Sequence, residues 1–130
     1  MSSAGQSKSV VGWKLDPHER DQLLQRFPPR WPDTIADHVT LQARAPREVP
    51  LPAATNGEIV GTADDCSGLE ALVLRIGGTV DRPGGGTYHI TWSLDRAAGR
   101  RPVESNDLRA RQGWKGIAEP VSIALRPARF

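Results

Sequence analysis

The sequence has little of several features that mark particular protein classes. It contains one cysteine, Cys66, in 130 residues, so an internal disulfide cannot form. A reducing compartment, the cytoplasm, is therefore expected. No run of about 18 apolar residues occurs, which argues against a membrane-spanning helix. The first eight residues have no apolar stretch after their charge, so they do not resemble a secretory signal.

Charge of one sign is also scarce, since the formal net charge is only +2. So small a net positive charge argues against a protein that coats nucleic acid. Lysine is rare, with fourteen of the seventeen basic residues being arginine. The planar arginine fork suits phosphate contacts, although a GC-rich genome explains the same bias equally well. The charge therefore supports a phosphate ligand only weakly.

The composition that remains is that of an ordinary folded domain. Hydrophobic residues make up 38% and charged residues 25%, and 13 glycines and 11 prolines predict many turns. We expect a flexible tail at residues 1–8 and one domain at residues 9–130, acting as a monomer.

Residue patterns predict an α+β domain dominated by about six strands. Asp16 and Pro17 are a typical helix start, with Glu19 three residues after the cap, and Pro28-Pro29 should end that helix. A second short helix is expected from Ser105 or Asn106 to about Gln112. The segment 69–76 also fits a helix, but a strand is favoured. The predicted strands are residues 10–15, 37–44, 58–64, 69–76, 87–94 and 121–125.

Two of these strands carry nearly the same motif. One contains His38-Val39-Thr40-Leu41 and the other His89-Ile90-Thr91-Trp92. Because side chains two residues apart share a face of a strand, each histidine should lie beside its threonine, with the apolar residues turned to the core. Either pair taken alone also fits a solvated sheet face.

The repeated pair has the groups that open a phosphodiester without a metal. One imidazole can accept a proton from water while the other donates a proton to the leaving oxygen. The two threonine hydroxyls can hold the phosphate oxygens as charge develops. A strained cyclic phosphodiester is the easiest such substrate. The motifs therefore predict a phosphoric diester hydrolase with His38 and His89 as acid and base and with Thr40 and Thr91 as phosphate ligands.

These residues resemble the two-histidine (2H) phosphoesterases, which carry two His-x-Thr/Ser motifs on strands of two pseudo-symmetric lobes. The family includes RNA 2′,3′-cyclic phosphodiesterases, the cyclic phosphodiesterase domains of tRNA ligases, and phage enzymes that degrade cyclic-nucleotide signals. The resemblance covers roughly residues 9 to 126. It implies antiparallel sheets in two lobes around a central cleft, an RNA end or cyclic nucleotide as substrate, and no cofactor. The chain differs in being short and in lacking a long predicted helix between the motifs.

Other readings remain open at this point. The chain could bind a nucleotide or RNA without turnover, hydrolyse cyclic oligonucleotide signals, or act as a transferase-like ligase at a 2′ position. Arg96 and Arg101 could hold an RNA backbone, and a solvated surface explains them equally well. No metal site is expected, because Asp37 and His38 lack further ligands nearby. Gly84-Gly85-Gly86 is interpreted as a mobile loop near the second motif.

Overall fold

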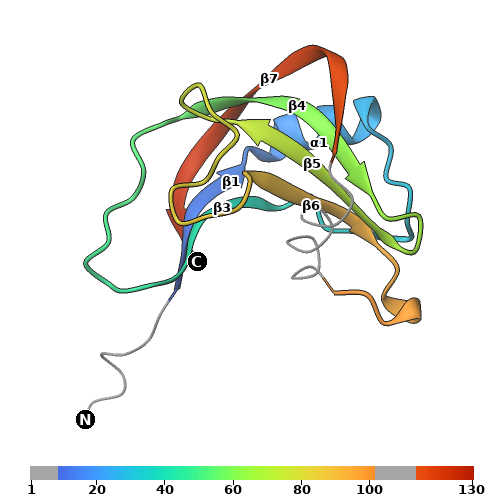
Figure 1. The fold of residues 1–130 in the computed structure, drawn as a ribbon, viewed down its shortest axis with the longest axis horizontal. Helices are drawn as coiled ribbons and strands as arrows, with labels where there is room; N and C mark the ends of the chain where they lie inside the picture. Colours follow the sequence, from blue (N-terminus) through green and yellow to red (C-terminus); the bar gives the residue numbers. More distant parts are fainter. Residues whose placement is uncertain (1–8, 102–113) are drawn as a thin grey trace.

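The computed structural model describes residues 9–101 and 114–130 (Figure 1). The predicted tail at residues 1–8 and the predicted helix near residues 105–112 lie outside these ranges. The described elements are β1 (Ser9–Leu15), α1 (Pro17–Arg26), β2 (Asp33–Thr34), β3 (His38–Ala45), β4 (Asn56–Asp64), β5 (Leu69–Arg75), β6 (His89–Leu94), the 3-10 turn η2 (Arg96–Ala98) and β7 (Lys115–Arg129). Strands dominate, as the sequence predicts for an α+β domain.

The strands form one curled antiparallel sheet in the order β2-β6-β5-β4-β7-β1-β3 (Figure 1). The long strand β7 joins its two parts. Residues 115–116 and 121–124 of β7 pair with β4, whereas residues 125–129 pair with β1. β3 and β6 are not neighbours in this order, yet they are in contact because the sheet curls.

A short ladder connects the two ends of the curled sheet. β2 pairs with the end of β6, and the next two residues continue the contact. The Ile35 N–H donates to the carbonyl of Trp92 at 2.9 Å, and the Ala36 N–H donates to the carbonyl of Thr91 at 3.0 Å. After Ala36 the chain turns to β1, since the Leu15 N–H donates to the Asp37 carbonyl. We call the line along which residues 33–36 meet residues 91–94 the seam. Beyond Ala36, β3 and β6 are not paired.

The helix α1 begins as its sequence predicts. The carboxylate of Asp16 accepts from the backbone N–H groups of His18 and Glu19, both at 3.1 Å, and Pro17 occupies the first turn. The Glu19 carboxylate does not bond back to the cap as a capping box would. It accepts instead from the backbone N–H of Ala124 in β7 at 2.9 Å. This contact ties the helix start to the sheet.

One face of the sheet holds the main hydrophobic core. Fully buried side chains from β1, β3, β5 and β6 meet there, and Leu23 of α1 packs against them. The Trp92 indole N–H donates to the carbonyl of Phe27, which fastens the end of α1 to β6 at 2.8 Å. The helix therefore covers the core face and leaves the motif strands at the seam.

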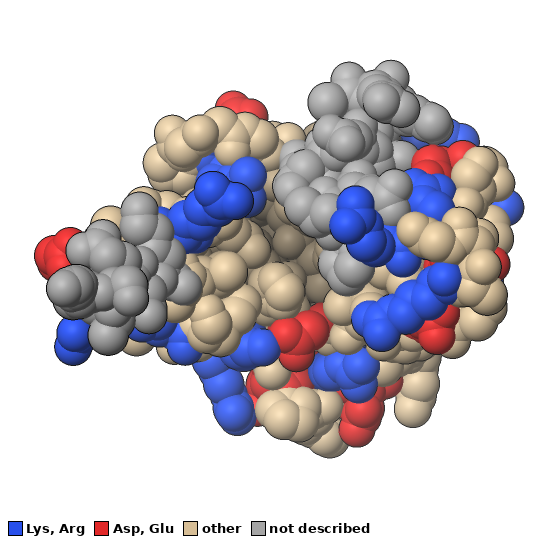
Figure 2. All heavy atoms as spheres, turned by 90° about the horizontal axis from the view of Figure 1, so that it is seen from below, with Lys and Arg blue, Asp and Glu red and all other residues tan. Residues whose placement is uncertain are grey.

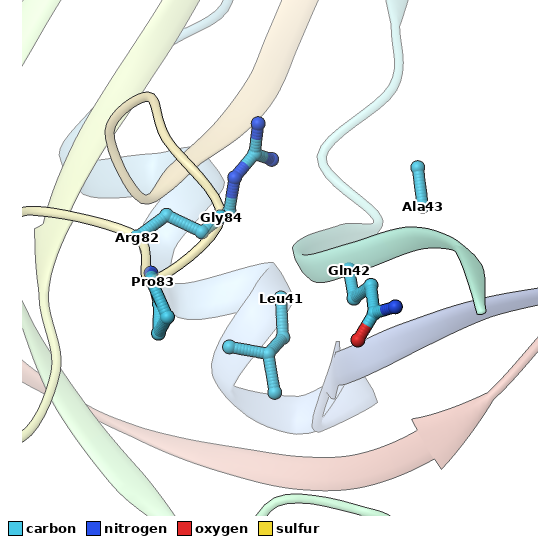
Figure 3. Close-up of a pocket in the computed structure, with 6 residues that line it drawn as sticks. All are labelled: Leu41, Gln42, Ala43, Arg82, Pro83 and Gly84. Atoms are coloured by element: carbon cyan, nitrogen blue, oxygen red, sulfur yellow. The ribbon is translucent and has the colours of Figure 1, made fainter. Parts of the chain in front are cut away.

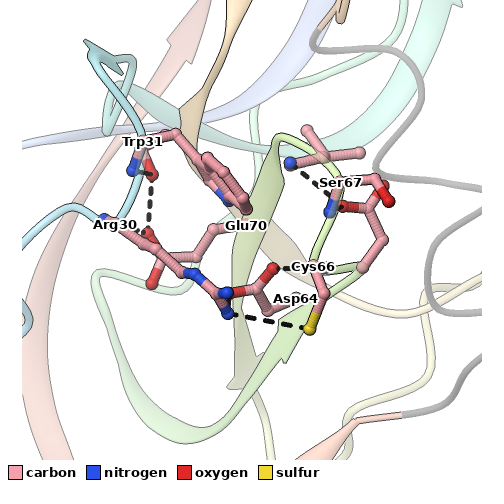
Figure 4. A network of polar contacts seen from close by, with 9 residues as sticks. Arg30, Trp31, Asp64, Cys66, Ser67 and Glu70 are labelled. Carbon is pink, nitrogen blue, oxygen red and sulfur yellow. Dashed lines mark hydrogen bonds and ion pairs between the residues drawn. The ribbon is translucent and has the colours of Figure 1, made fainter.

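A polar network anchors the loop that follows α1 (Figure 4). The Arg30 guanidinium pairs with the Asp64 carboxylate at 2.6 Å, and its backbone N–H donates to Glu70. The Ser93 hydroxyl donates to Glu70 and accepts from the backbone N–H of Trp31. The loop is thus fixed to β4, β5 and β6, and it positions β2 beside the end of β6.

All six predicted strands are confirmed, and apart from the last one their boundaries shift by at most two residues. That strand, predicted at residues 121–125, extends over Lys115–Arg129. The two-residue strand β2, Asp33–Thr34, is an addition to the strands predicted from the sequence. The segment 69–76 is a strand rather than a helix. Within the described ranges no helix is long and apolar enough to cross a bilayer.

Candidate functional site

The first motif begins strand β3. Val39 is fully buried and Leu41 packs against the main core, whereas His38 and Thr40 are only partly buried. The predicted alternation of the motif is therefore confirmed. It follows from the apolar residues, whose burial fixes which face the polar residues take.

A carboxylate holds the His38 ring. Asp37 Oδ2 lies 3.0 Å from His38 Nδ1 and 2.6 Å from Lys14 Nζ. Burial tends to raise the pKa of Asp37, but the hydrogen bonds from Lys14 and His38 outweigh it and hold that pKa below its usual value. Phe130 packs edge-on against His38 with ring centroids 4.8 Å apart. The carboxylate and the aromatic ring together fix the orientation of this imidazole.

The second motif begins strand β6. Ile90 and Trp92 are fully buried in the main core, His89 is 9% exposed and Thr91 is partly buried. His89 Nδ1 lies 2.9 Å from the carbonyl oxygen of Thr87. A backbone carbonyl thus holds this ring, where a carboxylate holds the ring of His38.

Both imidazoles are anchored through the same nitrogen. A carboxylate and a carbonyl oxygen only accept hydrogen bonds, so Nδ1 of His38 and Nδ1 of His89 must each carry a proton. In a neutral ring the proton-accepting nitrogen is then Nε2. In its neutral state each histidine is therefore the tautomer protonated at Nδ1.

The fold brings the two motif strands to the same seam. The last backbone bond across it joins Ala36 to Thr91, within the second motif itself. His38 follows Ala36 by two residues and His89 precedes Thr91 by two, so both motifs begin close in sequence to this bond. β3 and β6 remain in contact beyond this bond.

A pocket of about 550 Å³ opens between β3 and the turn that precedes β6 (Figure 3). Its lining residues come from these two segments and are Leu41, Gln42, Ala43, Arg82, Pro83 and Gly84. Arg82 Nε donates to the carbonyl of Gly85 at 2.9 Å, which fixes the guanidinium. Burial raises the pKa of Tyr88, the residue before His89, and the positive charge of Arg82 opposes this rise. A cation therefore stands close to the second motif.

The two arginines predicted to hold substrate are not brought to this seam by any described contact. Arg96 lies in η2, beyond the end of β6 opposite to His89, and its backbone N–H donates to Asp33. Strand β6 spans roughly 16 Å between those ends at about 3.3 Å per residue. Arg101 is exposed and is the last residue described before the gap. Arg82 lines a pocket together with Leu41 of the first motif, and Arg20 donates to the backbone carbonyls of Ile35 and Ala36 just before that motif.

Charged groups of both signs lie around the site, with Lys14 and Asp37 paired beside His38 and Arg82 lining the pocket. Figure 2 shows a hollow in the face seen from below, with Lys and Arg atoms on both sides of it and Asp or Glu atoms at its lower edge. Among residues 9–101 and 114–130, no three side chains of His, Cys, Asp or Glu lie close enough to hold a metal ion. The described residues near the two motifs are the histidines themselves and the charged side chains of Lys14, Asp37 and Arg82.

Sequence reasoning did not identify Lys14, Gln42 or Arg82 as site residues. Lys14 lies opposite His38 in the β1–β3 ladder, a relationship that strand pairing creates. Gln42 lies one residue after the first motif on the same strand, so the sequence already placed it near the motif. A glutamine there does not by itself indicate a binding role. Arg82 stands seven residues before His89, and only the turn at Gly84–Gly86 returns it toward β3.

No family model, curated protein sequence or solved structure matches this chain.

Proposed function

We propose that this protein is a metal-independent cyclic phosphodiesterase that hydrolyses 2′,3′-cyclic phosphates of RNA ends or nucleotides. One observation carries the proposal: two His-x-Thr strands flank one seam, and both imidazoles are anchored through Nδ1. Both histidines come from one chain, so a monomer supplies the complete set.

The proposed reaction uses four side chains. One histidine accepts a proton from water through Nε2, and the water oxygen forms a bond to phosphorus. The bond from phosphorus to one ribose oxygen breaks on the opposite side, and the other histidine donates its proton to that oxygen. Thr40 and Thr91 donate hydrogen bonds to the non-bridging oxygens, whose negative charge grows in the transition state.

The arrangement of strands supports a fold like that of the 2H phosphoesterases. β3 and β1 form one part of the sheet and carry His38, while β6, β5 and β4 form the other part and carry His89. β7 pairs with both parts. We propose that these parts correspond to the two lobes of that family. The absence of a helix between residues 42 and 88 of the described chain is a departure from its usual pattern.

Replacement of each histidine tests the proposal. His38→Ala and His89→Ala should each lose at least a hundredfold in kcat on 2′,3′-cyclic nucleotides, because each removes one proton transfer. His18→Ala is the matched control, since His18 is exposed on α1. All assays contain a chelator. Wild-type turnover in either motif variant would exclude the mechanism, and binding without any product would identify a non-catalytic nucleotide-binding module instead.

A further inference from the structure

The seam between the motif strands is joined by backbone hydrogen bonds only at one end, because β3 and β6 do not pair. At that end Ala36 bonds to Thr91, and His38 and His89 follow. At the other end lies the pocket between Leu41–Ala43 and Arg82–Gly84. Leu41 is three residues beyond His38, or roughly 10 Å along an extended strand at about 3.3 Å per residue. A nucleoside whose phosphate lies at the histidines would extend over this distance into the pocket.

A β-bulge turns two side chains of β3 toward the pocket. Thr40 pairs with Gly12 and Gln42 pairs with the adjacent Val11, so Leu41 is an extra residue on β3. Figure 3 shows the side chains of Leu41 and Gln42 directed to the same side of the strand. The bulge thus interrupts the alternation directly after the motif and adds a carboxamide to the pocket wall.

The pocket combines apolar walls with two polar groups. Leu41 and Pro83 offer apolar surface to the faces of a planar ring, and the volume of about 550 Å³ is within the range of nucleoside-sized ligands. Gln42 offers both a donor and an acceptor. The Nε of Arg82 donates to the carbonyl of Gly85. We therefore consider its two terminal nitrogens, Nη1 and Nη2, as the donors for a ligand. Among the described residues, no carboxylate forms an ion pair with Arg82.

We propose that this pocket binds the base of the substrate and prefers guanine, an inference that rests on the proposed function for the position of the phosphate. The paired terminal nitrogens of an arginine match O6 and N7 of guanine, a bidentate contact that no pyrimidine offers. The Gln42 carboxamide oxygen accepts from the ring N–H or the amino group of the same base. The substrate class is therefore a guanosine 2′,3′-cyclic phosphate, either as a nucleotide or at an RNA end.

A panel of the four nucleoside 2′,3′-cyclic phosphates tests the preference by activity. The wild-type protein should show the highest kcat/KM on the guanosine substrate. Arg82→Ala should lower that value by roughly tenfold to a hundredfold while changing the pyrimidine substrates little. Arg82→Lys should behave like the alanine variant, because an ammonium lacks the fork. Arg26→Ala, on the exposed side of α1, is the matched charge control. Equal values on all four substrates would overturn the inference and leave the hydrolase proposal intact.

A binding measurement separates the pocket from the reaction. Titration calorimetry with guanosine 3′-monophosphate and cytidine 3′-monophosphate needs no turnover. The wild-type protein and His89→Ala should bind the guanosine nucleotide at least tenfold more tightly, and Arg82→Ala should lose this difference while keeping its melting temperature. If base preference is found without hydrolysis, the pocket assignment stands and the proposed function fails. If Arg82→Ala retains the preference, the pocket assignment fails.

Discussion

Gly12 of β1 lies directly against the backbone of Thr40 in the first motif. The two residues are partners in the β1–β3 ladder. A Cβ atom at position 12 would stand 2.1 Å from the Val39 carbonyl oxygen and 3.1 Å from the Cα of Thr40. The absence of a side chain at Gly12 therefore allows the motif strand to approach β1.

Gly12→Ala should destabilise the fold and displace the first motif. The obstacle is backbone, which cannot rotate away, so we expect a loss of about 2–3 kcal/mol in the free energy of unfolding. Urea denaturation measures this loss. Gly84→Ala is the matched control, because a Cβ at Gly84 meets nothing within 4 Å. Equal stability of the two variants would contradict the structural argument.

Asp37→Ala should slow the reaction through His38. We assign Asp37 as a positioning residue, since its carboxylate contacts the His38 imidazole. Loss of the partner that fixes a histidine tautomer costs roughly tenfold to a hundredfold in activity. We expect this loss in kcat with KM nearly unchanged, and partial rescue by Asp37→Asn, whose amide oxygen still accepts. Asp21→Asn, exposed on α1, should have no effect.

Thr40→Val and Thr91→Val should each lower kcat without unfolding the chain. Valine has the shape of threonine but no hydroxyl, so each change removes one donor to the developing charge. Loss of one such donor costs roughly a hundredfold in kcat. Thr55→Val, on the exposed segment before β4, is the control. A change in KM alone would assign the hydroxyls to ground-state binding.

Acidification should destabilise the protein partly through Asp65. Burial tends to raise the pKa of Asp65, but the ion pair with Arg100 at 2.6 Å and the N–H groups of Ser67 and Leu69 hold it below its ordinary value of 3.8. The unfolded chain therefore binds the proton more tightly. The stabilisation is complete above about pH 4 and is lost as the pH falls through the lower folded value.

Melting temperatures measured from pH 7 to pH 2 test this dependence. Asp65→Asn should melt lower than the wild type at pH 7, and the difference should shrink on acidification. Asp21→Asn serves again as the control. A constant difference across the range would show that the charge of Asp65 does not stabilise the fold.

The sequence predicts the local parts of this molecule well. The helix start at Asp16 and the two His-x-Thr strands depend on neighbouring residues, so their patterns are visible in the chain. The length of β7 was not visible, because Gly116, Pro120 and Pro127 interrupt its pattern. Pairing with β4 on one side and with β1 on the other extends that strand. Tertiary pairing here overrides local preference.

In the candidate site, too, the local features were predictable from the sequence and the features created by tertiary pairing were not. The alternation in each motif follows from Val39 and Ile90, which the core buries, so the faces of the histidines were predictable. The bulge at Leu41 was not, since it arises where Gln42 pairs with Val11. The contact of Glu19 with Ala124 crosses 105 residues and replaces the local bond that its spacing suggested.

The shortest strand has the greatest mechanical influence on the chemistry proposed. β2 contains only Asp33 and Thr34, yet its ladder with β6 is where the curled sheet meets itself. Only residues 35–37 separate β2 from β3, so the ladder between β2 and β6 constrains where β3 begins relative to β6. Changes to these two residues would alter the spacing of the two imidazoles, although neither residue lines the pocket. Selection for a wider or narrower substrate can therefore act on residues outside the pocket.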